Sequence, residues 1–296
     1  MPSLHLRELL RYPVKSMLGE SLSETAVGEK GIPGDRIWAT RDEQRGGIRG
    51  GKKLPQLMMF SAATGAGSAP MITAPDGDTC AASSDEVHRW LSEKLDHPVT
   101  LWPLLPAENL DHYRRGAPDD EDFEQELRSV FGRLPDEPIP DLTMFAEVLE
   151  FESPPGTYFD AFPILVMTYQ SMATLAKRHP KGQFDARRFR PNLLVDAVDD
   201  TSPFPEQTWI GKQLRIGDVV LEIVGTCPRC SMTTHATSDL PRDTSIMRYL
   251  VKEAEGNLGV YAKVVTAGTL KLGQALEVIW AASKRWLLDS IPFKGR

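Results

Sequence analysis

Residues 212–224, with the sequence KQLRIGDVVLEIV, contain two short strand-like runs separated by a Gly-Asp pair. Further runs of this kind lie at residues 193–195, 260–265 and 275–279. Many short strands with Gly, Pro or Asp between them are typical of β-barrels. The C-terminal half therefore predicts a barrel-type β-architecture with a few helices.

The rest of the chain adds more strands and three helices, which predicts a β-rich α+β fold. Ser83 and Glu86 are spaced to form a capping box, and Thr168 can act as an N-cap. The expected strands are residues 4–9 and 36–40 and the buried run 162–167. The expected helices are residues 85–95, the segment after Thr168, and residues 245–254.

Composition limits the possible partners. The 296 residues carry 34 Lys and Arg against 41 Asp and Glu, a net charge of −7. A surface of this sign does not attract nucleic acid or an anionic membrane through bulk charge. A phosphate-bearing ligand would therefore need a local basic cluster. No signal segment and no apolar run near the roughly 20 residues of a membrane span are visible. Three cysteines are too few for a disulfide scaffold, and a cytoplasmic location is expected.

Residues 119–126 hold six carboxylates in eight positions, within a stretch from about residue 105 to 141 that Pro and Gly interrupt. Such a charge run is usually a solvated loop or a connector between domains. The alternative interpretation is a docking surface for a redox partner.

The most specific local feature is Cys227-Pro228-Arg229-Cys230. Two thiolates three residues apart could bind zinc, cycle as a redox dithiol, pack as buried thiols, or provide one lone metal ligand. A zinc site would need further ligands, for which only His235 is near. An adjacent guanidinium favours the thiolate form, so Arg229 is expected to lower the thiol pKa.

Two basic clusters could bind an anion. Residues 187–192 carry three arginines and Asn192, and guanidinium groups match phosphate oxygens in pairs. Lys15 and Ser16, with Arg36 downstream, offer a charge and hydroxyl donor in a loop that Pro13 keeps out of a central strand. Either cluster alone could simply be a charged surface turn. The two clusters form one site only if the fold brings them together.

These residues resemble the MOSC family, in particular its amidoxime-reducing members and those that detoxify N-hydroxylated bases. The N-terminal part of the resemblance rests on residues 12–16 and 34–38. The C-terminal part rests on residues 189–192, Trp209, 216–218, 227–230, 233–234, 259–261 and 268–273. The resemblance implies a MOSC β-barrel, similar to the pyruvate-kinase barrel, after a smaller N-terminal β-barrel domain. The implied divisions are an N-terminal domain at 1–104, an acidic connector at 105–141, a MOSC domain at 142–281 and a tail at 282–296.

The resemblance also implies a molybdenum–molybdopterin cofactor between the two domains. Cys230 would be the molybdenum ligand and the catalytic residue, with Cys227 as a neighbouring or structural thiol. Asp160-Ala161-Phe162 lies where the amidoxime reducers have a Thr-Ser pair, so hydroxyl contacts are lost there. The implied cofactor contacts are Lys15, Ser16, Arg36, Ala161, Phe162, Arg190, Asn192, Pro228, Arg229 and Tyr261.

The implied activity is reduction of small N-hydroxylated compounds. The chain lacks the Cys-x4-Cys-x2-Cys spacing of a plant-type ferredoxin cluster, so a separate ferredoxin-type or flavin-type protein is expected to donate electrons. The tail at 283–288 could help to dock that donor or close the fold. Two alternatives are sulfur transfer through a cysteine persulfide and non-catalytic carriage of the cofactor. A pyridoxal phosphate role has been suggested for the family, but no lysine is in a context that singles it out for a Schiff base.

Overall fold

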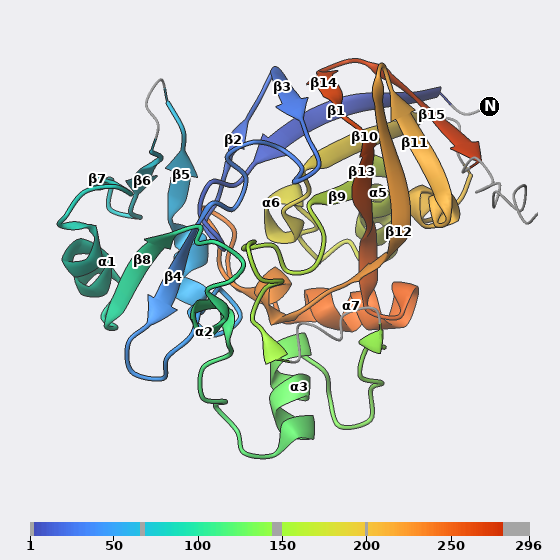
Figure 1. The fold of residues 1–296 in the computed structure, drawn as a ribbon. Coiled ribbons are helices and arrows are strands. Elements are labelled where there is room, and N and C mark those ends of the chain that lie inside the picture. Colours follow the sequence, from blue (N-terminus) through green and yellow to red (C-terminus); the bar gives the residue numbers. More distant parts are fainter. Residues whose placement is uncertain (1–2, 66–68, 144–149, 199–200, 281–296) are drawn as a thin grey trace, which may run out of the picture.

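The structure is a computed structural model that describes residues 3–65, 69–143, 150–198 and 201–280 (Figure 1). Its strands are β1 Ser3–Arg11, β2 Glu20–Ser21, β3 Glu24–Val27, β4 Trp38–Asp42, β5 Ser61–Ala63, β6 Met71–Thr73, β7 Thr79–Ala81, β8 Val99–Pro103, β9 Ile164–Thr168, β10 Leu193–Val198, β11 Lys212–Ile216, β12 Val219–Pro228, β13 Asn257–Thr266, β14 Gly268–Lys271 and β15 Ala275–Trp280. Its helices are α1 Val87–Leu95, α2 Leu110–Tyr113, α3 Phe123–Phe131, α5 Tyr169–Arg178, α6 Ala186–Phe189 and α7 Ser245–Ala254, with 3-10 turns η1 Pro55–Met59, η3 Pro205–Trp209 and η4 Ser231–Thr234.

Seven strands close into a barrel in the order β10-β9-β13-β12-β11-β15-β1, and β1 pairs back to β10. Only the β9–β10 pair among them is parallel. Alternate side chains of β12 are buried, as the two-residue period of a strand requires. They join an apolar core with buried residues of β1, β10 and β13. The structure confirms the β-rich fold with a closed barrel.

A smaller β-rich unit lies beside the barrel (Figure 1, left). It contains the β4–β8 pair, the β5-β6-β7 sheet and α1, around a core of its own. The first strand of the chain, β1, lies outside this unit by its pairing, because it closes the barrel between β10 and β15. The chain therefore contributes its first strand to the barrel before it enters the smaller unit.

Helix boundaries follow local sequence signals with one exception. Helix α7 has the predicted bounds, and the Thr168 side chain caps α5 by accepting from the Ser171 backbone N–H. The predicted capping box at Ser83 is wrong. Ser84 accepts from the Glu86 backbone N–H instead, and α1 begins at Val87 with no side-chain cap on its first turn.

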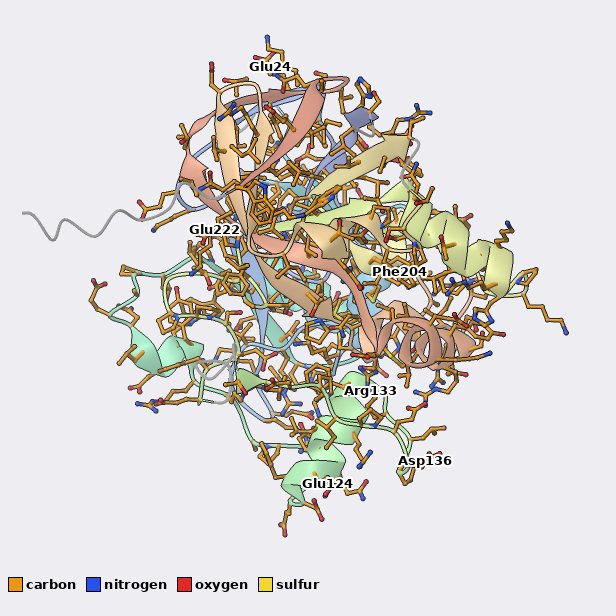
Figure 2. All side chains as sticks on the ribbon, turned by 90° about the vertical axis from the view of Figure 1, so that its right-hand side faces the viewer. Glu24, Glu124, Arg133, Asp136, Phe204 and Glu222 are labelled. Carbon is orange, nitrogen blue, oxygen red and sulfur yellow. The ribbon has the colours of Figure 1, made fainter. Side chains whose placement is uncertain are left out.

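The acidic stretch contains two helices, α2 and α3, where the sequence predicted a solvated loop. Asp122 is the N-cap of α3 and accepts the backbone N–H groups of Glu124 and Gln125. Figure 2 shows Glu124 on the outer end of α3 and Arg133 beyond its other end, toward α7. The predicted tail at 282–296 lies outside the described residues. No helix in the described ranges is long and apolar enough to cross a membrane.

Candidate functional site

A cavity of about 370 Å³ lies between the barrel, the N-terminal unit and α3. This volume is in the range of small-molecule sites. The basic side chains that line it are Arg36, Arg49, Lys52, Lys53, Arg115, Arg188, Arg190 and Arg229. The carboxylates that line it are Glu126, Glu152 and Asp160. A chain of net charge −7 therefore concentrates positive charge here, as an anionic ligand would require.

Arg36 and Arg190 lie against one aromatic ring. Their guanidinium carbons are 5.0 and 4.3 Å from the centroid of the Tyr12 ring. Both residues have left-handed backbone conformations, with φ of 50° and 56°, which few residues other than Gly adopt without cost. The strained backbone brings two like charges together in a buried place.

Arg190 has one buried donor that no described protein group uses. Its Nη1 donates to the Met17 carbonyl, but its buried Nη2 has no hydrogen-bond partner in the part of the chain that is described. Burial, and next the charge of Arg36, lowers the pKa of Arg190 to about 10. Arg36 is neutralised by Asp35. An anion beside Arg190 would satisfy both the free donor and the charge.

Lys15 lies behind the cavity surface and has its own partners. Its Nζ donates to Ser153 Oγ at 3.2 Å, to the Tyr158 carbonyl at 2.9 Å and to Asp160 Oδ1 at 2.9 Å. Ser16 also acts locally, since its Oγ accepts from the Gly51 backbone N–H at 2.8 Å. Both residues thus support the cavity from within its wall.

Asn192 lines the cavity but holds the backbone together. Its Oδ1 accepts from the Leu165 N–H at 3.2 Å and its Nδ2 donates to the Leu10 carbonyl at 3.3 Å. The same Oδ1 accepts a longer 3.4 Å contact from Arg36. The amide therefore fastens β1 and β9 beside the arginine pair.

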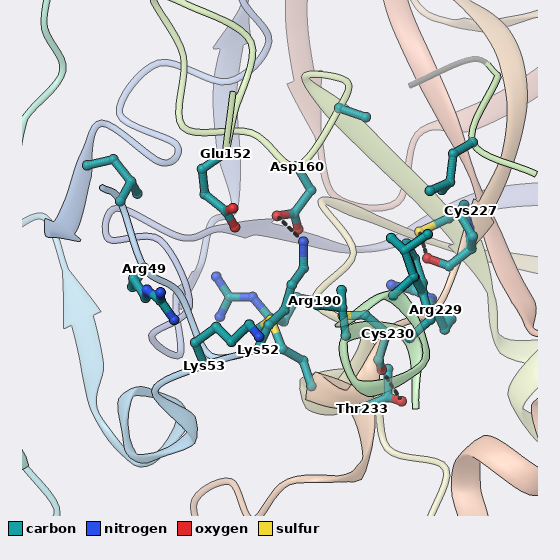
Figure 3. Close-up of a pocket in the computed structure, with 18 of the residues that line it drawn as sticks. Arg49, Lys52, Lys53, Glu152, Asp160, Arg190, Cys227, Arg229, Cys230 and Thr233 are labelled. Atoms are coloured by element: carbon teal, nitrogen blue, oxygen red, sulfur yellow. Dashed lines mark hydrogen bonds and ion pairs between the residues drawn. The ribbon is translucent and has the colours of Figure 1, made fainter. Parts of the chain in front are cut away.

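The cysteine motif lies at the end of β12, which extends through Pro228 because Pro228 pairs with Asn257 of β13. Cys227 is buried, while Cys230 precedes η4 and is partly exposed at the cavity. Both are free thiols. Figure 3 shows Cys227 and Cys230 at one end of the cavity and Lys53 at the other.

Arg229 lowers the pKa of both thiols, as predicted, but its charge does not overcome the effect of burial. The guanidinium of Arg229 donates to the Leu258 carbonyl at 2.9 Å and the Phe189 carbonyl at 3.0 Å. Burial raises the pKa of Cys230. The nearby charge of Lys52 lowers this pKa, and it does so more strongly than the charge of Arg229. Burial also raises the pKa of Cys227. The hydrogen bonds of Arg229 therefore hold the backbone of β13 and α6 in place. Both thiols favour the protonated form.

Two alternative interpretations of the motif lose support. Among the described residues, no group of three or more His, Cys, Asp or Glu side chains could hold a metal. A structural zinc site, which normally takes four protein ligands, is thus not formed around Cys227, Cys230 and His235. The motif also lies between a strand end and a 3-10 turn rather than in the βαβ context of a thioredoxin dithiol.

The remaining predicted contacts form an apolar side of the cavity. Ala161, Phe162 and Tyr261 all line it, and the rings of Phe162 and Tyr261 are 5.4 Å apart. Helix α3 covers the cavity with its own apolar side chains. These are Phe123, Leu127, Val130 and Phe131.

Sequence reasoning missed several lining residues. Lys52 and Lys53 follow the Gly-rich stretch 46–51, and this Lys-Lys pair was the available signal. Lys53 Nζ lies 2.7 Å from Asp119 Oδ2 and 2.5 Å from Glu126 Oε1, so part of the acidic stretch pairs with the cavity edge. Asp160 was noted only as a departure from a family pattern. Its position beside Lys15 and Lys52 could not be read from the sequence.

Within the arginine cluster, Arg190 is the one whose side chain has a buried donor without a partner among the described residues. Arg187 pairs with Asp185 and Asp239. Arg188 donates to backbone carbonyls, including that of His235 at 2.8 Å. Lys15 meets the cavity through Asp160, while Arg190 and Cys230 line it directly. The fold thus unites the three distant clusters.

Comparisons with known proteins identify two domains in the chain. Residues 3–95 match the MOSC N-terminal beta barrel domain and residues 154–277 match the MOSC domain. Mitochondrial amidoxime reducing component 2 of Bos taurus is 28% identical, over 90% of this chain and 80% of the bovine protein. Molybdenum cofactor sulfurase of Oryza sativa subsp. japonica is 25% identical, over 77% of this chain but 28% of the rice protein.

Among solved structures, the YUAD protein from Bacillus subtilis has a TM-score of 0.44 at 12% identity, covering 95% of this chain and 97% of that chain. The two domain matches lie in the same order as the N-terminal unit and the barrel described above. The chain belongs to the family of MOSC-domain proteins that carry an N-terminal MOSC β-barrel domain.

Proposed function

We propose that the chain binds a molybdenum cofactor in this cavity and reduces N-hydroxylated compounds with electrons from a separate redox protein. The observation that carries the proposal is the unpartnered, buried Nη2 of Arg190 in the same cavity as the Cys230 thiol. The guanidinium donor of Arg190 is suited to bind a phosphate-type anion, and the sulfur of Cys230 is suited to bind a soft metal. A single ligand that carries both fits this donor set.

The residues suggest a division of roles. Arg190 and Arg36 would hold the phosphate, and the Cys230 thiolate would bind molybdenum. Asn192 and Arg229 would keep these groups in place through the backbone, since their side chains are engaged with it. Lys15 and Ser16 would act from the cavity wall. The bound cofactor would supply the two-electron chemistry, and the protein the binding, orientation and electrostatics.

The net reaction cleaves the N–O bond of the substrate, consumes two electrons and two protons, and releases water. The electron donor would be a ferredoxin-type or flavin-type protein. Phe123, Leu127 and Phe162 would exclude water from the substrate and contact its apolar part, because they line the same cavity with apolar side chains. The bovine relative is named as an amidoxime reducing component, which motivates the choice of substrate class.

The direct test is conversion of benzamidoxime to benzamidine by metal-loaded protein with a chemical reductant. We expect conversion by the wild type and by Cys80→Ala, whose thiol lies in β7 of the N-terminal unit, and none by Cys230→Ala. No conversion by wild type at full molybdenum occupancy would contradict the reductase proposal.

Sulfur transfer is the second candidate, because one relative is a molybdenum cofactor sulfurase. The raised pKa of Cys230 does not separate the two candidates, since metal ligation and persulfide chemistry both require the thiolate. Mass spectrometry separates the two functions. A labile adduct of about 32 Da on Cys230 that turns over would favour sulfur carriage. Cofactor retention without turnover by any donor would instead favour the non-catalytic carrier.

A further inference from the structure

Asp160 is the carboxylate that lies among the cations of the cavity. Its side chain is 45% exposed, although the Lys15 side chain beneath it is only 6% exposed. It belongs to a segment without regular structure that precedes β9. In Figure 3 the Asp160 carboxylate points into the cavity, toward the side where Arg190 and Lys52 are drawn.

One oxygen of this carboxylate meets two lysines. Oδ1 lies 2.9 Å from Lys15 Nζ and 3.7 Å from Lys52 Nζ. Lys15 has two further acceptors, Ser153 and the Tyr158 carbonyl, so its three donors are all used. Burial works against the charged form, yet Lys15 and Lys52 hold the pKa of Asp160 far below its usual range. Asp160 therefore stays ionised and neutralises part of this lysine pair.

Arg190 is different. Within the described residues it has no carboxylate within ion-pair distance, and one of its donors is buried and unused. Arg36, beside it, is paired with Asp35. Arg188 and Arg229 also line the cavity without a carboxylate partner, but their guanidinium groups donate to backbone carbonyls. Among the described cations of the cavity, Arg190 is therefore the one that has neither a carboxylate partner nor full use of its donors.

We propose that Asp160 determines where, and how tightly, the cavity binds a phosphate-type anion. Its carboxylate occupies the position that an anion would otherwise take at Lys15 and Lys52, and so restricts anion binding to Arg190 and Arg36. The inference rests on the proposed function for the identity of the natural anion, a phosphate group of the cofactor. The chemistry itself concerns any phosphate-type anion.

The ionised carboxylate of Asp160 should also lower the affinity of the cavity for phosphate. The ionised Asp160 repels a phosphate bound at Arg190, because both residues line the same small cavity of about 370 Å³. Replacing Asp160 by Asn removes this repulsion, frees Lys15 and Lys52 to attract the anion, and keeps the shape of the side chain. Allowing for the solvent exposure of Asp160, we expect phosphate affinity to rise on the order of tenfold.

Glu152 provides a matched control. It also lines the cavity, and its replacement by Gln changes the net charge equally. Its carboxylate, however, pairs with Arg115 at 2.6 Å, and it acts on Lys15 and Lys52 only from beyond ion-pair distance and more weakly than Asp160 does. Glu152→Gln should therefore change phosphate affinity by less than about threefold.

The experiment is a calorimetric titration of inorganic phosphate into the full chain, produced in a host that makes no molybdopterin. Wild type, Asp160→Asn and Glu152→Gln are compared at one ionic strength, with thermal melts to verify folding. Tighter binding by Asp160→Asn alone supports the inference. Unchanged or weaker binding by Asp160→Asn, equal gains in both variants, or no phosphate binding by either wild type or Asp160→Asn would overturn it.

A failed reductase proposal would be recognised separately, because it is tested by benzamidoxime turnover of molybdenum-loaded wild type. Phosphate affinity of the cofactor-free variants does not depend on that turnover.

Discussion

The segments around Arg190 and Arg229 contain two equally buried arginines, each 7% exposed and each lining the same cavity. Arg229 gives its donors to the carbonyls of Leu258 and Phe189. Arg190 keeps one buried donor unused among the described residues. A buried guanidinium that is satisfied by backbone stabilises the fold, whereas one that is left incomplete marks a place for a ligand.

The largest difference in effect between two neighbouring residues is expected for Cys230 and Cys227. Cys230→Ala is expected to abolish molybdenum content and to lower reductase activity at least about a thousandfold, because the proposed metal ligand is removed. Cys227→Ala should be milder, since this thiol is buried beside Tyr261 and Leu165. Metal analysis and single-turnover kinetics measure both variants. Equal losses in the two would show that the ligand is wrongly assigned.

Arg190→Met tests the incomplete arginine. Loss of a charge-assisted contact to phosphate should weaken cofactor retention roughly 10- to 100-fold. The free energy of unfolding of the cofactor-free chain should change by only about 1 kcal/mol, because the guanidinium is already under-satisfied. Cofactor release in dialysis and urea unfolding give the two numbers. Strong destabilisation with normal retention would reverse the interpretation.

Arg229→Met tests the satisfied arginine. Two buried carbonyls lose their donors, so unfolding free energy should fall by about 2–4 kcal/mol. Urea unfolding of the cofactor-free chain measures this loss, with Arg187→Met as the exposed control, which should change it by less than about 1 kcal/mol. If Arg229→Met folded as stably as wild type but lost its cofactor, Arg229 would be a ligand-binding residue after all.

The smallest effect is expected at Glu206, a fully buried carboxyl in the barrel unit. Its Oε2 accepts from Thr168 Oγ1 at 2.6 Å and from Ser171 Oγ at 2.5 Å, and burial raises its pKa. A carboxyl with a raised pKa in the folded state loses stabilising free energy as pH rises from its unfolded value through its folded value. Glu206→Gln should therefore gain stability over wild type with increasing pH, by about 1 kcal/mol at neutral pH. Thermal melts measure the stability of the variant and of wild type across pH. If the difference between them did not change with pH, Glu206 would not titrate in this way.

The fold was predictable where the signals are local. Helix α7 has its predicted bounds, and Thr168 caps α5 as expected. Strand β12 extends beyond residue 224 because its last residues pair with distant β13. Helix α3 was missed under its acidic composition, although its apolar residues 123, 127, 130 and 131 follow helical spacing. The closure of the barrel by β1 depends on partners more than 180 residues away, which no local pattern encodes.

The site was predictable in its residue types and less so in their roles. The resemblance identified Arg190, Cys230 and Tyr261, which all line the cavity. It could not show that Arg229 is used by backbone carbonyls, or that Lys15 is neutralised by Asp160. Hydrogen-bond partners of this kind are fixed by tertiary contacts, and the order of residues along the chain does not contain them directly.

The central claim is that one ligand in this cavity joins Cys230 to Arg190. Its most direct test is molybdenum content, measured on freshly purified chain from a host that makes molybdopterin. The account predicts nearly stoichiometric molybdenum in wild type and in Cys80→Ala, strongly reduced content in Arg190→Met, and none in Cys230→Ala. Folded wild type without molybdenum, or Cys230→Ala that retains it, would contradict the account.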